Sequence, residues 1–204
     1  MRNLTVLSVG ETEIAPKPLH LLLREATREV HKRLHRHDGF AAIQNSTINI
    51  AEYRRLLLRL CGFYVPLEPA AAIGHDRSVW LEDDLSALDV DRQMIAAAPR
   101  CSNIPGLNSA EGQLGARYVI EGPALGGREL GRCLDGLLGP GVARGRWFFL
   151  GNGSGTGEAW KGYLAHLSAA SDEPEVRAAI TKAAIETFKA FEEWLSGWSS
   201  VTHV

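Results

Sequence analysis

The stretch LHLLLREATREVHKRL, residues 19–34, decides the fold. Its apolar residues recur at a spacing that places them on one face of a helix, and His37-Asp38-Gly39 ends the run. The stretch therefore predicts one long amphipathic helix, with His31 on the flank of its apolar face. The residues of that face are Leu19, Leu22, Leu23, Ala26, Val30 and Leu34.

Further helices are expected along the rest of the chain. Asn49 and Glu52 have the spacing of a capping box at the start of the second helix, and Pro66 is expected to kink or end that helix. Convincing alternating strands and internal repeats are absent from the sequence. The prediction is an all-α fold in one domain, residues 18–204, after an arm of residues 1–17. The other helical segments are expected within 77–98, 109–122, 126–138 and 158–170, and from about 173 to 198. The apolar stripe of the last one is expected to be Ile180, Ala184, Phe188, Phe191, Leu195 and Trp198.

The composition excludes several classes of protein. The 204 residues are 45% hydrophobic and carry a formal net charge of −2, with both signs interspersed, so no global basic field would recruit nucleic acid. No apolar run approaches the length of a membrane span, and the first residues lack the pattern of a signal peptide. Three dispersed cysteines suggest neither a zinc site nor a disulfide framework. A cytoplasmic location is therefore expected.

His31 and His35 are the first candidate site. They lie one turn apart on the same side of the predicted helix, where either imidazole could meet a planar apolar ligand. A histidine beside an apolar face is usually a hydrogen-bonded surface or core residue, so helix geometry alone favours the structural interpretation. A two-histidine metal site is a weak alternative, because further ligands at a recognisable spacing are missing.

Two glycine-rich stretches and one acidic pair are the other candidates. GPALGG, residues 122–127, interrupts a helical region, either as a simple turn or because backbone there approaches a ligand. GNGSGTG, residues 151–157, lacks the Gly-Lys-Ser/Thr ending of a phosphate loop and is interpreted as a helix connection. Asp83 and Asp84 are expected on a solvated helix face.

Several of these blocks together resemble the haem oxygenase family, in particular its bacterial biliverdin-forming branch, often found beside bacterial phytochromes. LREATREVH, residues 23–31, is similar to the proximal helix of the family, in which a leucine, a basic residue, Ala-Thr and then the axial histidine occur in this order. GARYVIEGPALGG, residues 115–127, is similar to the distal helix, whose glycines lie over the haem. EY at 52–53, FYVPLE at 63–68, and RWFF at 146–149 with the glycine run and Trp160 resemble further family blocks.

The resemblance implies specific roles. His31 would be the axial ligand of the haem iron, and Gly122, Gly126 and Gly127 would form the distal surface over the haem. Arg24 and Arg28, which precede His31 on its helix, are the primary candidates for the haem propionates. The remaining candidates for haem contact are Thr27, Arg117 and Tyr118.

Two positions depart from the family pattern. Many relatives have an acidic residue one turn after the axial histidine to accept its ring N–H, and this chain has His35. His31 would then donate to a backbone carbonyl, to water or to neutral His35. Where animal-type relatives have an aspartate that organises water, this chain has Pro123, so ordered water held by backbone groups would deliver protons. Glu121 is the nearest distal acid.

The implied activity is the oxidative cleavage of haem to biliverdin, iron and carbon monoxide. Haem would be both substrate and cofactor, with dioxygen and an external electron donor, either a ferredoxin or a flavoprotein reductase. A phytochrome is the implied acceptor of biliverdin. A non-enzymatic haem carrier or sensor of the same fold stays open as an alternative. A thiaminase-like enzyme would need a cysteine or carboxylate nucleophile, for which there is no local signature.

Overall fold

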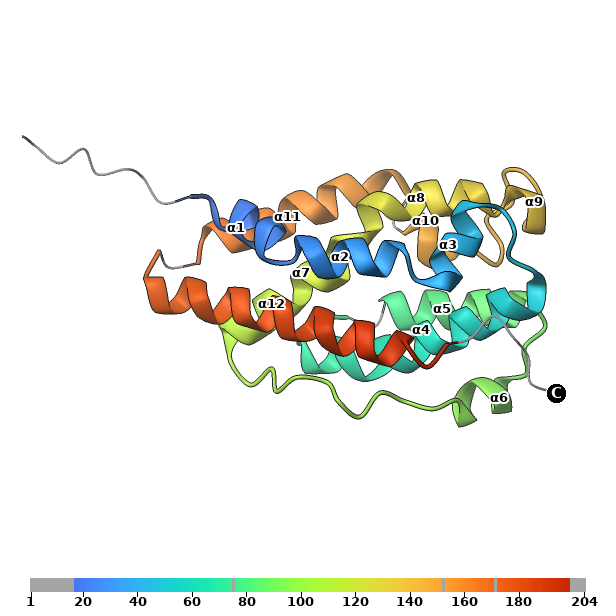
Figure 1. The fold of residues 1–204 in the computed structure, drawn as a ribbon, viewed down its shortest axis with the longest axis horizontal. Helices are drawn as coiled ribbons and strands as arrows, with labels where there is room; N and C mark the ends of the chain where they lie inside the picture. The colour runs from blue at the N-terminus through green and yellow to red at the C-terminus, as the bar shows by residue number, and fades with distance from the viewer. Residues whose placement is uncertain (1–16, 75, 152, 171, 199–204) are drawn as a thin grey trace, which may run out of the picture.

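The structure is a computed structural model that describes residues 17–74, 76–151, 153–170 and 172–198. The described residues are helical, with no strand among them, which confirms the predicted all-α class (Figure 1). Apart from Lys17, the expected N-terminal arm lies outside the described residues. The helices are α1 Leu19–Ala26, α2 Arg28–His35, α3 Asp38–Gln44, α4 Ile50–Ala70, α5 Asp76–Ala87, α6 Arg92–Ala97, α7 Ala110–Glu121, α8 Pro123–Cys133, α9 Asp135–Leu138, α10 Trp147–Leu150, α11 Thr156–Ser168 and α12 Pro174–Leu195, with a 3-10 turn η1 at Gly153–Gly155.

The long helix α12 packs along α7, and this contact organises the fold. The two helices approach closely at Gly115, because a Cβ atom there would lie 2.3 Å from the carbonyl oxygen of Ile180. Helix α1 packs against α11 and α12, and α2 also contacts α12 (Figure 1). The main hydrophobic core surrounds α4, and a smaller cluster lies between α1, α11 and α12.

The histidine-bearing segment is two helices and not one. Thr27 separates α1 from α2 with φ −100° and ψ 1°, and its hydroxyl donates to the carbonyl oxygen of Leu23 at 2.8 Å. Such a back-bond competes with regular helix geometry. The helical bonding nevertheless continues across the break, since the amide of His31 donates to the carbonyl oxygen of Thr27 at 3.0 Å. The predicted stop near His37 is followed at once by the short helix α3, which His37 caps.

Helix α4 starts as expected and ends later than expected. The side chain of Asn49 accepts from the amide of Glu52, whose carboxylate accepts from the amide of Asn49, which confirms the capping box. Pro66 does not end the helix, which continues to Ala70. Proline cannot donate to the carbonyl four residues earlier, here that of Gly62. That carbonyl accepts instead from the amide of Cys101 at 2.9 Å, so the missing helical bond leaves no buried acceptor unpaired.

The interruption at GPALGG is only one residue wide. Helix α7 ends at Glu121 and α8 begins at Pro123, while Gly122 between them keeps helical dihedrals of φ −58° and ψ −46°. The segment 77–98 contains two helices, α5 and α6, because the chain turns at Asp89 with a positive φ of 60°. The short helix α10 over the WFF block was not expected.

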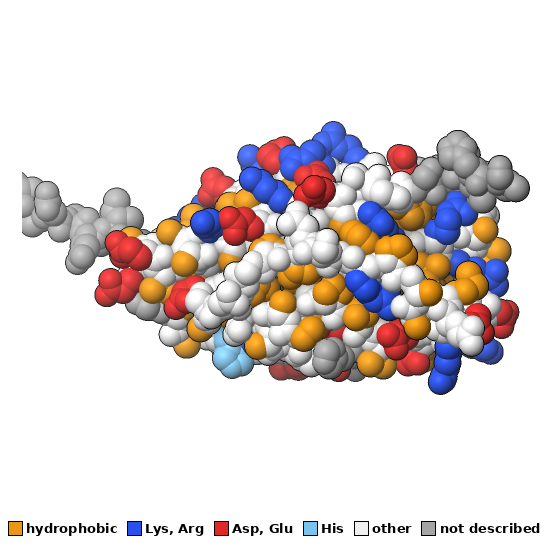
Figure 2. Space-filling model, turned by 90° about the horizontal axis from the view of Figure 1, so that it is seen from below, with side chains coloured by type: hydrophobic (Ala, Val, Ile, Leu, Met, Phe, Trp, Pro, Cys, Tyr) orange, Lys and Arg blue, Asp and Glu red, His pale blue; other side chains and the backbone are white. Residues whose placement is uncertain are grey.

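The surface agrees with the low net charge of the chain. On the face shown in Figure 2, acidic and basic side chains are interspersed among apolar ones. Within the part of the chain that the structure describes, no helix is both long enough and apolar enough to cross a membrane.

Candidate functional site

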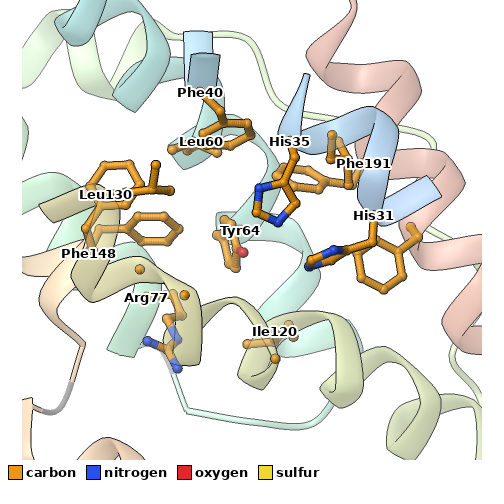
Figure 3. Close-up of a pocket in the computed structure, with 16 residues that line it drawn as sticks. His31, His35, Phe40, Leu60, Tyr64, Arg77, Ile120, Leu130, Phe148 and Phe191 are labelled. Carbon is orange, nitrogen blue, oxygen red and sulfur yellow. The ribbon is translucent and has the colours of Figure 1, made fainter. Parts of the chain in front are cut away.

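A cavity of about 280 Å³ lies between the histidine-bearing helix α2 and the α7–α8 segment (Figure 3). Helices α3, α4, α5, α10 and α12 supply the rest of its wall. A concave site with mostly apolar walls and few polar groups suits a flat hydrophobic ligand. The apolar residues that line it are Leu34, Phe40, Leu60, Ile120, Leu130, Phe148, Phe149, Phe188 and Phe191.

His31 lines this cavity from α2. Val30 and Leu34 are buried and fix the helix against the core, which turns the imidazole toward the cavity (Figure 3). Its ring meets the ring of Phe188 edge to face, with centroids 6.2 Å apart. The surrounding protein lowers the pKa of His31 by burial, and the neighbouring His35 lowers it further. A neutral imidazole is the form that binds a metal ion, so the environment favours a ligand role.

His35 lines the same cavity one turn later. The two imidazole centroids are 4.6 Å apart in an edge arrangement. Its Nδ1 atom lies 3.3 Å from Nε2 of Gln44 on α3. His35 is therefore both a neighbour that can tune His31 and the alternative ligand that the sequence raised. Among the described residues, no group of three or more His, Cys, Asp and Glu side chains could hold a metal ion by themselves.

The three glycines of the interrupted region all line the cavity, but their surroundings differ. Around Gly126, a Cβ atom would meet nothing within 4 Å, so the space beside it is open. At Gly127, a Cβ atom would lie 2.6 Å from the carbonyl oxygen of Phe149, so this glycine allows α8 to pack closely on α10. Gly122 joins the two helices. Only Gly126 combines a place on the cavity wall with free space in front of it.

Thr27 and Tyr118 lie together outside the cavity lining. Thr27 is buried. Burial raises the pKa of Tyr118, and the side chains of Thr27 and Arg24 partly offset this rise. The ring of Tyr118 packs against Phe188, itself a cavity residue, with centroids 6.4 Å apart. These residues therefore form a layer behind the cavity, and a direct contact with haem stays a prediction.

The three predicted propionate arginines are also outside the lining. Arg24 and Arg28 are exposed, and Arg28 forms an ion pair of 3.3 Å with Glu29. The guanidinium of Arg117 lies 5.8 Å from the ring centroid of Tyr163. The structure thus groups His31 and the three glycines around one cavity and leaves the three arginines at its periphery, where their role stays a prediction.

Two polar residues of the cavity, Tyr64 and Arg77, were not among the site residues predicted from the sequence. Tyr64 was expected in the second helix as a structural residue, and Arg77 had no distinguishing signal. Phe188 and Phe191 were correctly placed on the apolar stripe of the last helix, and they also form part of the cavity wall.

The expectation for Asp84 is wrong, because this residue is fully buried rather than solvated. Its two carboxylate oxygens accept hydrogen bonds from the amides of Trp147 and Phe148 at 2.7 and 2.9 Å. Burial raises the pKa of Asp84 to about 7, and these two amide bonds oppose the rise. Asp84 thereby fixes the start of α10, which carries Phe148 and Phe149 to the cavity.

Comparison with known proteins now identifies this arrangement. The family model described as "Heme oxygenase" matches residues 17–197. The chain belongs to the haem oxygenase family. The match covers the histidine helix, the glycine-bearing segment and every described residue of the cavity.

The fold of this haem oxygenase family member is also found in a solved structure. Haem oxygenase from Leptospira interrogans matches with a TM-score of 0.72 and 16% identity, over 88% of this chain and 99% of that chain. At this identity the likeness concerns the fold. None of the curated proteins compared with the chain matches it significantly.

Proposed function

We propose that this protein is a haem oxygenase that binds haem through His31 and opens the macrocycle to biliverdin, iron and carbon monoxide. The observation that carries the proposal is the arrangement of one cavity. The imidazole of His31 projects into the cavity from α2 (Figure 3). The glycine with open space beside it, Gly126 of α8, lines the same cavity. The family match supports the same reaction class.

His31 would hold the iron from the proximal side. A neutral histidine can bind iron without first losing a proton, and the lowered pKa of His31 keeps that form available at neutral pH. The aromatic residues around it, Phe188 among them, would pack against the macrocycle and exclude water from it. His35 would orient His31 through ring contact, in place of the acidic residue found in many relatives.

The opposite face of the haem would stay open for dioxygen. The described residues that α7 and α8 contribute to the cavity are Ile120, Gly122, Gly126, Gly127 and Leu130, and none of these can bind iron through a side chain. A second protein ligand from this segment would block dioxygen, as in electron-transfer haem proteins. The chemistry supplied by bound haem is the activation of dioxygen, which then attacks the macrocycle itself.

The propionates and electrons would be handled at the periphery. Arg24 and Arg28 are proposed to hold the propionates, with Arg117 and Tyr118 helping from the other side and Thr27 as a further haem contact. Electrons would come from a ferredoxin or a flavoprotein reductase. Assignment to the phytochrome-associated branch, with a phytochrome as acceptor of biliverdin, belongs to the same proposal.

Product identification tests this function. Haem is titrated into the protein without oxygen, and then air, a reductant and catalase are added, so that free hydrogen peroxide cannot drive the reaction. We expect one haem per chain, followed by biliverdin and a stoichiometric yield of carbon monoxide.

A His35→Ala variant is the matched control. It removes the neighbouring imidazole and should retain turnover at a reduced rate if His31 is the ligand. Recovery of intact haem from the wild-type protein after prolonged reduction in air would instead identify a carrier or sensor.

A further inference from the structure

A second cavity of about 260 Å³ adjoins the apolar cavity that His31 lines, which is called the haem cavity from here on. It is lined mainly by charged and polar side chains, and it shares two residues, Arg77 and Ile120, with the apolar cavity. A polar cavity of this size has room for several water molecules, each of which takes up about 30 Å³ in the liquid. Its other polar or aromatic residues are Glu68, Asp76, Trp80, Arg117 and Glu121.

Arg77 forms the partition between the two cavities. Its guanidinium donates to Oε2 of Glu121 at 3.2 Å, and the side chains of these residues are only 8% and 18% exposed. The same guanidinium lies over the ring of Trp80, 4.8 Å from the centroid. The backbone amide of Arg77 donates to the carboxylate of Glu68 at 2.7 Å. Both ends of Arg77 are therefore held, by residues from three different helices.

The haem cavity itself offers few groups that could bring protons to its distal side. Its described lining contains four polar side chains, and two of these are the histidines of α2. The other two are Tyr64 and Arg77. Burial raises the pKa of Tyr64 well above its usual range, so the phenol stays protonated. Reduction of dioxygen consumes protons, and an apolar wall cannot supply them.

We propose that Arg77 is a positioning residue that joins the polar cavity to the distal face of the haem. Glu121 holds the guanidinium of Arg77, and the guanidinium orders water between the two cavities. Protons pass from solvent through this water to dioxygen on the haem. A guanidinium does not lose its proton in proteins, so Arg77 orders the water and does not itself transfer a proton. Glu121 precedes Gly122 directly, which places this partition at the start of the glycine segment. This inference rests on the proposed function.

The test uses variants that remove the guanidinium of Arg77 with and without the charge of its partner Glu121. Arg77→Met removes the guanidinium and keeps an unbranched stem, and Arg77→Met/Glu121→Gln avoids leaving an unpaired buried carboxylate. Glu121→Gln alone keeps an acceptor for Arg77. Arg92→Met makes the same side-chain change at an exposed position on α6 and serves as the control.

Two readouts are measured on the haem complexes. The first is the pH midpoint at which water on ferric haem becomes hydroxide, followed by absorption, which does not require turnover. We expect it to move by half a unit or more in both variants that lack Arg77. The second is single-turnover conversion with its solvent isotope effect, for which removal of an ordered proton path should slow the reaction by about tenfold or more. Glu121→Gln should lose less than about threefold, because a neutral acceptor still holds Arg77.

The outcomes separate this inference from the proposed function. An unchanged ferric midpoint and an unchanged turnover rate in Arg77→Met and in the double variant would overturn the role of Arg77. A wild-type protein that never opens haem would overturn the proposed function, while the ferric midpoint would still report whether Arg77 orders distal water. Thermal unfolding shows whether each variant is folded. If Arg77→Met does not fold because Glu121 is left unpaired, the charge-neutral Arg77→Met/Glu121→Gln variant provides the test.

Discussion

Substitutions at the adjacent glycines Gly126 and Gly127 should have opposite effects on stability. A Cβ atom at Gly126 would meet nothing within 4 Å, so leucine there begins without a clash at Cβ and gains helix propensity of about 0.8 kcal/mol. For a domain of this size such a gain raises the melting temperature by roughly 2 to 3 °C. Alanine at Gly127 would place its Cβ atom 2.6 Å from the carbonyl oxygen of Phe149. The resulting overpacking of about 1 to 3 kcal/mol outweighs the gain in propensity.

Activity should follow a different order. The side chain of Gly126→Leu would enter the cavity on the side left for dioxygen, and misplacement of reacting groups by about 1 Å can reduce a rate roughly a hundredfold. We therefore expect a well-folded Gly126→Leu protein whose biliverdin formation falls by about tenfold or more. Gly126→Ala is the graded control, since a single methyl group reaches less far into the cavity.

Thermal unfolding of the haem-free proteins and single-turnover kinetics of their haem complexes measure the two effects separately. A Gly126→Leu protein with normal dioxygen binding and normal turnover would refute the placement of Gly126 over the haem. A Gly126→Leu protein that unfolds more easily than wild type would refute the open space from which the stability gain was derived.

Three further predictions concern pH, a buried cap and a helix crossing. Burial lowers the pKa of His31 below its ordinary value of 6.5, so haem affinity should stay constant from pH 8 to about 6.5 and fall only below that. In the unfolded chain the pKa of His31 is higher than in the folded protein, so the unfolded chain takes up its proton first as the pH falls. The stability contributed by neutral His31 is therefore present above pH 6.5 and is lost as the pH falls through the pKa of the folded protein. Comparing the pH dependence of unfolding in wild type and His31→Ala measures this contribution. Asp84→Ala leaves the amides of Trp147 and Phe148 without their acceptor and should reduce the free energy of unfolding by about 2 kcal/mol or more in denaturant titrations, with Asp84→Asn losing less. Gly115→Ala would place its Cβ atom 2.3 Å from a carbonyl oxygen of α12 and should lower the melting temperature, whereas the same change at exposed Gly157 should not.

Features encoded by neighbouring residues were predictable from the sequence. The capping box depends only on Asn49 and Glu52, which lie three residues apart, and the structure contains it as expected. The apolar stripe of the last helix follows from its period, and Phe188 and Phe191 lie in the core as that stripe predicts. His31 was recognised because a local block of residues precedes it, and the structure brings it to the same cavity as Gly126.

Features that depend on distant contacts were not predictable. Of the two outcomes expected at Pro66, a kink or an end, the end is wrong: the helix continues to Ala70, and the amide of Cys101 satisfies the carbonyl that Pro66 leaves free. Asp84 was expected on a solvated face, and its burial depends on α10, more than sixty residues later. Arg77 carries no local signal at all. Its place in the wall depends on Glu121 and on the packing of α4, α5 and α7.

The most direct test of the account is the spectrum and turnover of the His31→Ala haem complex, measured with and without added imidazole beside the matched His35→Ala complex. The account predicts that His31→Ala loses the histidine-type ferrous carbon monoxide spectrum and biliverdin formation, that imidazole restores the spectrum, and that His35→Ala keeps both. A His31→Ala protein with the parental spectrum and normal turnover, together with loss of both in His35→Ala, would contradict the account and identify His35 as the ligand.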